Sequence, residues 1–191
     1  MKSACVGVGA LLTTSLVCVA TLAANAGATP ANEAARLVLT KRDVGTAYRL
    51  NASFTSAHTL REVSVNAPPS IKRELARKWV AGMQTGFNGV TVRRGIISTA
   101  DVFRTPNIDA IVRHWQRLYL RNSRGKLLPV PEHAPGTSRI LIRGRMVSDT
   151  VLLYFWVHGP RILTVWQFGP SASLRPKQLF ELARRQDAKV S

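Results

Sequence analysis

Thiol chemistry is almost absent from this chain. Its two cysteines, Cys5 and Cys18, both lie within the first 28 residues. If that segment is removed, the remaining domain has no disulfide, no cysteine–metal site and no cysteine nucleophile. Such a domain depends on its hydrophobic core, and most of a 191-residue chain is enough to form one.

Acidic residues are also scarce. The chain has 10 Asp and Glu against 27 Lys and Arg, which gives a formal net charge of +17. An arginine-rich composition spread over a solvated surface would explain this charge, whereas a patch assembled by folding would attract anions. As candidate anion-binding residues we take six arginines: Arg93, Arg94, Arg139, Arg143, Arg145 and Arg161. The partners expected are an anionic wall polymer, acidic lipid headgroups or another protein; nucleic acid is not expected.

Motifs for catalysis and for cofactors are missing too. The sequence has no HExxH, P-loop, GxGxxG or EF-hand loop, so we assign no metal ligand, cofactor or catalytic residue. One alternative is a hydrolase-like enzyme that uses the adjacent acid–base pair Glu132 and His133 together with Asp101. Asp101 lies in an otherwise neutral apolar stretch, where we expect a salt bridge to an arginine of the sheet such as Arg143.

The first 28 residues resemble an export signal. Lys2 is their only charge, a long apolar run follows it, and "ANAGA" supplies small residues for cleavage. The sequence therefore predicts a secretory signal peptide at residues 1–28 and one exported domain at residues 29–191, in the extracytoplasmic space or at the cell envelope. An uncleaved N-terminal anchor is the alternative.

The longest apolar run beyond that segment is "VLLYFWVHGPRILTVWQFGP", residues 151–170. A membrane-spanning helix needs about 20 residues with few interruptions. Gly159, Pro160 and Arg161 interrupt this run at its middle, and each half is rich in β-branched and aromatic residues. We therefore predict an antiparallel hairpin with a four-residue loop at 158–161, rather than a membrane span.

The remaining periodicities predict helices and strands in alternation. Helices are expected after Thr29, from residue 71 to 83, after Pro106 and after Pro176; strands are expected at residues 60–66, 85–88, 92–104 and from 138 onward. Residues 45–56 read as irregular. Consecutive strands joined by short turns favour antiparallel pairing. The predicted fold class is α+β: a single domain with a mainly antiparallel sheet and helices packed on one face.

Several segments of the chain, taken together, resemble a known group of proteins. "LVLTKRDVGTAYRL", "WVAGMQTGF" before "GIISTADVFRT", and "VLLYFWVHGPRILTVWQFG" followed by "LFELARRQDAKV" resemble a group of small exported proteins of actinobacteria and related soil bacteria. Val44 and Gly45 depart from the Leu-Pro usual in that group. The layout is also similar to the extracellular sensor domains of receptor kinases and to PsbP/Mog-like domains. This resemblance implies a fold and no residue-level function.

These observations favour a non-enzymatic, exported binding or accessory domain of the cell envelope with a basic surface suited to anionic partners. Two alternatives remain open at this stage. One is the hydrolase-like enzyme described above. The other is a small-molecule sensor with an apolar pocket between sheet and helices.

Overall fold

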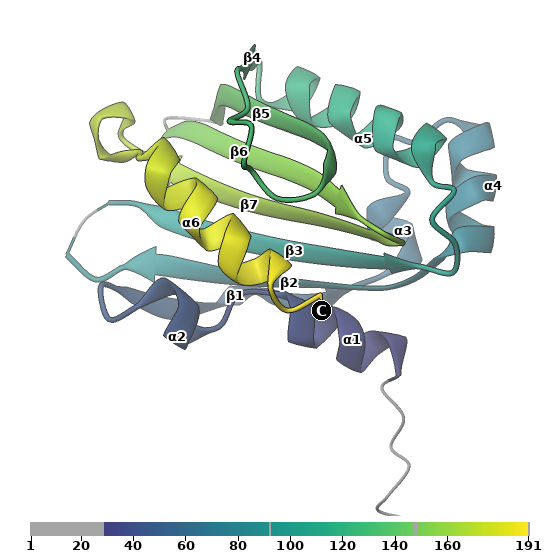
Figure 1. The fold of residues 1–191 in the computed structure, drawn as a ribbon, viewed down its shortest axis with the longest axis horizontal. Helices are drawn as coiled ribbons and strands as arrows, with labels where there is room; N and C mark the ends of the chain where they lie inside the picture. The colour runs from purple at the N-terminus through teal and green to yellow at the C-terminus, as the bar shows by residue number, and fades with distance from the viewer. Residues whose placement is uncertain (1–28, 92, 147–148, 191) are drawn as a thin grey trace, which may run out of the picture.

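The computed structural model describes residues 29–91, 93–146 and 149–190. The predicted signal segment lies outside these residues, so its boundary stays a prediction. The described residues form one seven-stranded sheet in the order β1-β2-β3-β7-β6-β5-β4, and every neighbouring pair is antiparallel. The strands are β1 (Tyr48–His58), β2 (Trp79–Gly89), β3 (Gly95–Phe103), β4 (Lys126–Leu128), β5 (Thr137–Met146), β6 (Asp149–His158) and β7 (Arg161–Gly169) (Figure 1).

The late apolar run is the hairpin β6–β7, as predicted. His158 pairs with Arg161, so the connection between the strands is only the two residues Gly159 and Pro160, shorter than the four-residue loop expected. Gly159 has a φ of 56°, a left-handed conformation that glycine adopts without a side-chain clash, and proline fixes a negative φ after it. No helix of the described residues has the length and apolar character needed to cross a membrane.

Local capping signals set where the helices begin. Thr29 accepts a hydrogen bond from the backbone of Asn32, and Thr40 and Thr59 each form a capping box with the acidic residue three positions later. Prolines occupy the first turns of three helices. The helices are α1 (Pro30–Leu37), α2 (Lys41–Val44), α3 (Leu60–Val63), α4 (Pro69–Lys78), α5 (Asp109–Asn122), the 3₁₀ turn η1 (Ser171–Ser173) and α6 (Pro176–Asp187).

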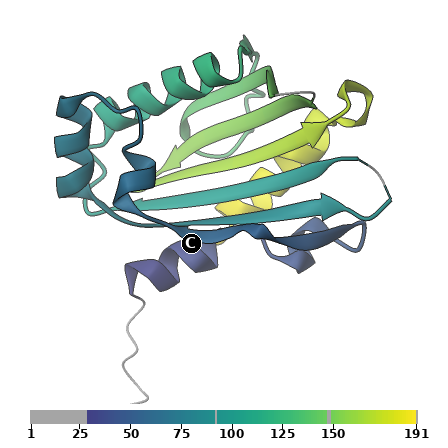
Figure 2. The same cartoon turned by 180° about the vertical axis from the view of Figure 1, so that it is seen from behind.

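The α+β class with a single antiparallel sheet is confirmed, and the helices cover both faces of the sheet rather than one. Along β6, Tyr154 and Trp156 pack in the core shared with α1 and α6, whereas Phe155 and Val157 pack in the core shared with α4 and α5. Figure 1 shows α6 in front of the sheet, and Figure 2 shows α5 and α4 on the side seen from behind. A strand that is apolar at consecutive positions has to be covered on both faces, and β6 is such a strand.

Three predicted elements differ in the structure. Residues 60–66 contain the short helix α3 instead of a strand, and the segment read as irregular contains β1. The helix expected to reach Met83 ends at Lys78, so that Trp79 and Met83 belong to β2. The four-residue spacing of the apolar positions explains this error, since residues four apart share one face of a strand as well as one face of a helix.

A buried polar network fixes α6 on its face of the sheet. Gln186 is fully buried; its side chain donates to the carbonyl of Thr99 at 2.7 Å and accepts from the hydroxyl of Ser98 at 3.0 Å. The Nε1–H of Trp156 donates to Asp187 at 2.8 Å. Helices α1 and α6 thus cover this face over β2, β3, β6 and β7, and the opposite face carries the site described next.

Candidate functional site

An apolar pocket of about 520 Å³ lies on the α4–α5 face of the sheet. Helix α5 and the segment from β1 to α3 stand on either side of it, and the strands between them remain uncovered in the view from behind (Figure 2). Its walls are mostly apolar and aromatic, including Phe54, Val63, Trp115, Leu118, Trp166 and Phe168. Two of the chain's four tryptophans, Trp115 and Trp166, therefore line a cavity.

Strand alternation builds the floor of this pocket. In β3, Ile96, Ala100 and Val102 face the α6 side, so that Ile97, Thr99 and Asp101 face the pocket. Thr99 pairs with Thr164 of β7, and their buried hydroxyls lie 2.7 Å apart in a hydrogen bond. The floor thus presents a short row of polar side chains below apolar walls.

The polar row ends in a buried carboxylate with two partners. Asp101 is 3% exposed, and its Oδ1 accepts from Trp79 Nε1 at 3.0 Å and lies 3.1 Å from His58 Nδ1. The register aligns His58 with Gly82 and Gly82 with Asp101, so the two side chains meet across three strands above a glycine. A Cβ on Gly82 would lie 2.2 Å from Asp101 Oδ1 and 2.9 Å from His58 Nδ1, so the contact requires glycine there.

The electrostatics of this pair favour a charged imidazole. Burial lowers the pKa of His58, but the hydrogen bond and charge of Asp101, with a smaller contribution from Glu62, outweigh burial and raise the pKa above its ordinary value. Burial also raises the pKa of Tyr119, so its hydroxyl stays protonated. The pocket therefore combines apolar walls with a hydrogen-bonding, protonatable group at its base, which suits binding a largely apolar molecule with one polar group.

The predicted acid–base set is not brought together. Asp101 pairs with His58, and the expected salt bridge to Arg143 is not formed. Glu132 and His133 are exposed in the loop before β5, and that loop lies over the α6 face: Ala134 joins the core there, and Pro135 accepts from the hydroxyl of Tyr154 at 2.6 Å. Asp101 faces the other side of the sheet, so the hydrolase-like arrangement loses its structural basis.

Five of the six candidate arginines form side-chain contacts within the domain. Arg161 binds Glu33 (Nε–Oε1 2.6 Å), Arg93 lies 3.3 Å from Asp149, and Arg94 lies over the ring of Tyr48 at 5.0 Å. The guanidinium of Arg139 donates to the carbonyls of Glu132 at 2.9 Å and Ala134 at 2.7 Å.

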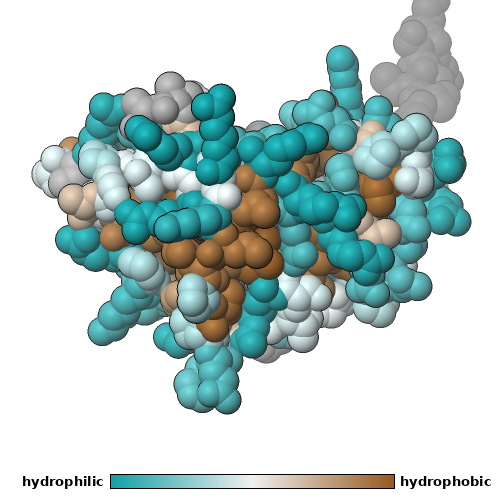
Figure 3. All heavy atoms as spheres, turned by 90° about the horizontal axis from the view of Figure 1, so that it is seen from above, coloured by the Kyte–Doolittle hydropathy of each residue, from teal (hydrophilic) through white to brown (hydrophobic). Residues whose placement is uncertain are grey.

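The other two candidate arginines are Arg143, whose guanidinium donates to the hydroxyl of Ser171, and Arg145. They are neighbours on one face of β5, where they line an open hollow with Arg124 and Lys126. Figure 3, which looks onto the side of the molecule where α5 and β4 lie, shows hydrophilic side chains around an apolar area.

The sequence analysis missed His58 as a site residue, and it placed Trp79 in the helix expected from residue 71 to 83. His58 was overlooked because the segment before it read as irregular, which gave no sheet on which to place the side chain. A weak signal existed in the four-residue spacing of His58 and Glu62. In the structure Glu62 completes the capping box of α3 with Thr59, and it lines the pocket.

Comparisons with known proteins bear on the fold. No protein-family model matches the chain, and no curated protein matches it. Among solved structures, the extracellular domain of PknH from Mycobacterium tuberculosis is similar, with a TM-score of 0.51 and 12% identity over 86% of this chain and 98% of that one. The likeness expected to receptor-kinase sensor domains thus holds for the fold.

Proposed function

We propose that this protein is an extracytoplasmic ligand-binding domain, without catalytic activity of its own, whose apolar pocket holds a small and mainly apolar molecule. The observation that carries the proposal is the 520 Å³ pocket with a buried His58–Asp101 pair at its base. That volume falls within the range of about 300–1,000 Å³ typical of small-molecule sites, and a few placed polar groups among apolar walls are typical as well.

Location outside the cytoplasm is part of the proposal. The apolar first 28 residues with Lys2 support export, as does the similar fold of a domain described as extracellular. The high net charge supports the further proposal that the domain stays near the cell envelope through anionic partners. Exposed charges act over about 8 Å at physiological salt, so that retention would weaken as salt increases.

Ligand binding is tested with the neutral apolar dye N-phenyl-1-naphthylamine, whose emission rises in apolar surroundings. We expect saturable binding by the unchanged protein. Leu118→Trp adds an indole to the pocket wall and should weaken binding at least about tenfold, because the added volume occupies the space of the dye. Leu127→Trp is the matched control, since Leu127 is 58% exposed and does not line the pocket.

Urea unfolding of each variant separates loss of binding from loss of folding. Leu118→Trp that unfolds like the parent but fails to bind supports the pocket as the site. Absence of dye binding by the parent, or equal binding by parent and both variants, would count against the proposal. If Leu118→Trp does not fold, Ile97→Phe on the pocket floor serves the same purpose.

A further inference from the structure

A second site candidate lies on the opposite face of the sheet, at the edge formed by β4. Four exposed basic residues line one open hollow of about 500 Å³ there, together with Thr150 and Ser171. The four are Arg124, Lys126, Arg143 and Arg145. Figure 1 shows β4 and β5 at the edge of the sheet away from β1 and β2.

Strand register brings these side chains to one face. Lys126 pairs directly with Arg143, and Arg145 pairs directly with Thr150. Leu141 of β5 faces the α6 side, so Arg143 and Arg145, two and four residues further along, share that face. The hydroxyl of Ser171 lies 2.5 Å from Nη2 of Arg143 and holds this guanidinium at the wall of the hollow.

The C-terminus of α5 adds Arg124 to the same place. The backbone N–H of Arg145 donates to the carbonyl of Ser123 at 2.7 Å, which fastens the end of the helix to β5. Gly144 permits this approach, since a Cβ there would lie 2.4 Å from that carbonyl oxygen. Arg124 follows with a φ of 45°, which turns the chain back toward β4.

The arrangement is electrostatically unfavourable by itself. Like charges directly opposite each other in a sheet destabilise it, and Lys126 faces Arg143 in this way. Within the described ranges, none of the four cations forms a salt bridge with a carboxylate. Asp149, close to Arg145 in the chain, faces the apolar pocket on the other side of the sheet and pairs with Arg93. The negative end of α5 offsets charge near Arg124 but does not lie between the two strands.

We infer that this hollow binds a phosphate group, and that the anion supplies the missing negative charge between β4 and β5. Guanidinium groups bind phosphate oxygens with two parallel hydrogen bonds, and the site presents three arginines, a lysine and two hydroxyls around one opening. The inference goes beyond the proposed ligand pocket, since the two sites lie on opposite faces of the sheet, and it gives the proposed attraction to anionic partners a defined place. Two of its residues, Arg143 and Arg145, are among the six arginines singled out in the sequence.

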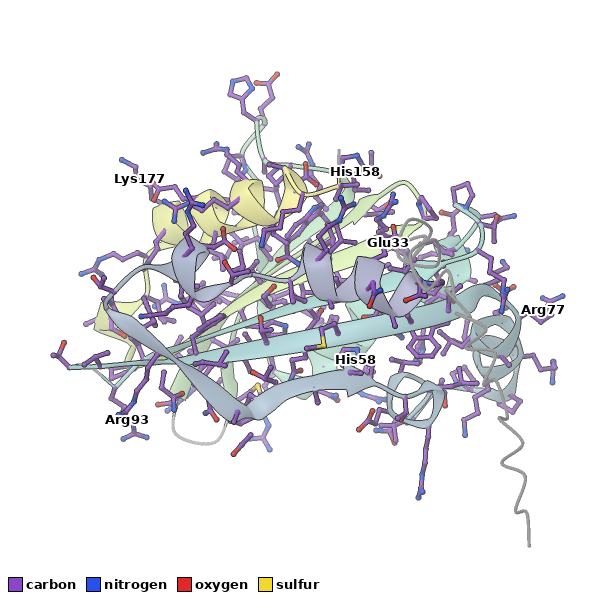
Figure 4. All side chains as sticks on the ribbon, turned by 90° about the horizontal axis from the view of Figure 1, so that it is seen from below. Glu33, His58, Arg77, Arg93, His158 and Lys177 are labelled. Carbon is purple, nitrogen blue, oxygen red and sulfur yellow. The ribbon has the colours of Figure 1, made fainter. Side chains whose placement is uncertain are left out.

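Two probes are used. Binding of inorganic pyrophosphate is measured by isothermal titration calorimetry. Binding to vesicles of phosphatidylglycerol or of phosphatidylcholine is measured by sedimentation. Arg143→Gln combined with Arg145→Gln should weaken binding to the preferred probe at least about tenfold, as expected for the loss of two charge-assisted contacts. The matched control is Arg73→Gln combined with Arg77→Gln, which removes the same charge from the exposed side of α4, where Arg77 points outward (Figure 4).

Binding of pyrophosphate but not of vesicles would identify a soluble phosphate as the source, and binding of phosphatidylglycerol vesicles alone would identify a lipid headgroup. Either result supports the site if the hollow variant loses binding and the control variant retains it. Equal loss in both variants would show attraction to net charge only and would overturn the inference. No binding of either probe by the unchanged protein would overturn it as well. Dye binding in the apolar pocket should be the same in all these variants, so the two proposals fail separately.

Discussion

Replacement of Asp101 by asparagine tests the central contact of the apolar pocket. The amide oxygen can still accept from Trp79 Nε1, so the change removes mainly the charged interaction with His58. A hydrogen bond to a charged group stabilises a protein by about 1.5–3 kcal/mol and a neutral one by about 0.5–1.5 kcal/mol. Because both side chains are well shielded, with 18% and 4% of their surfaces exposed, we expect Asp101→Asn to cost about 1–2 kcal/mol when His58 is protonated.

The cost should depend on pH in a definite direction. The pKa of His58 is raised in the folded protein by Asp101, despite burial, so the stabilisation is fully present below the unfolded value near 6.5. It is lost as pH rises through the folded value. The difference in unfolding free energy between the parent and Asp101→Asn should therefore be larger at about pH 5.5 than at about pH 8.

Urea unfolding followed by far-UV circular dichroism measures this difference at both pH values. Asp101→Leu should cost more, about 3–5 kcal/mol, since it leaves both Trp79 and His58 without their acceptor in a buried place. Asp149→Asn is the control and should cost under about 1 kcal/mol, because its partner Arg93 has a side chain that is 70% exposed. An equal cost of Asp101→Asn at both pH values would refute the assigned electrostatic role.

Two further pairs of substitutions test the fold around the sites. Gly144→Ala should cost about 3 kcal/mol or more in urea unfolding, because its Cβ would meet the backbone of Ser123, whereas Gly159→Ala should cost about 1 kcal/mol for its left-handed φ alone. If Gly144→Ala and Gly159→Ala lose the same unfolding free energy, the C-terminal end of α5 must be able to move away from the added methyl group. Leu75→Ala in α4 should cost about 2–5 kcal/mol, since Leu75 is completely buried, and Leu60→Ala at a side chain that is 38% exposed should cost much less. A small loss at Leu75 would mean that α4 contributes little to the core.

The sequence predicted best those elements whose signals are local. Gly159 and Pro160 fix a turn between two β-rich runs, and Thr29 with Pro30 marks a helix start, so the hairpin and α1 could be placed without knowing the rest of the fold. Prediction failed at β1 and β2. The exposed and irregular sequence of β1 gains its strand conformation from pairing with β2, and an apolar spacing of four fits either helix or strand.

Composition and hydrophobic pattern alone determined an α+β domain built on an antiparallel sheet. Both depend on the preference of each residue for helix, strand or turn within its local sequence. The sites required the tertiary structure. His58 and Asp101 are 43 residues apart and meet only because the register of three strands aligns them above a glycine. Arg143 gains Lys126 as its neighbour in the same way. Which charges share a face depends on strand order and register, and long-range pairing sets both.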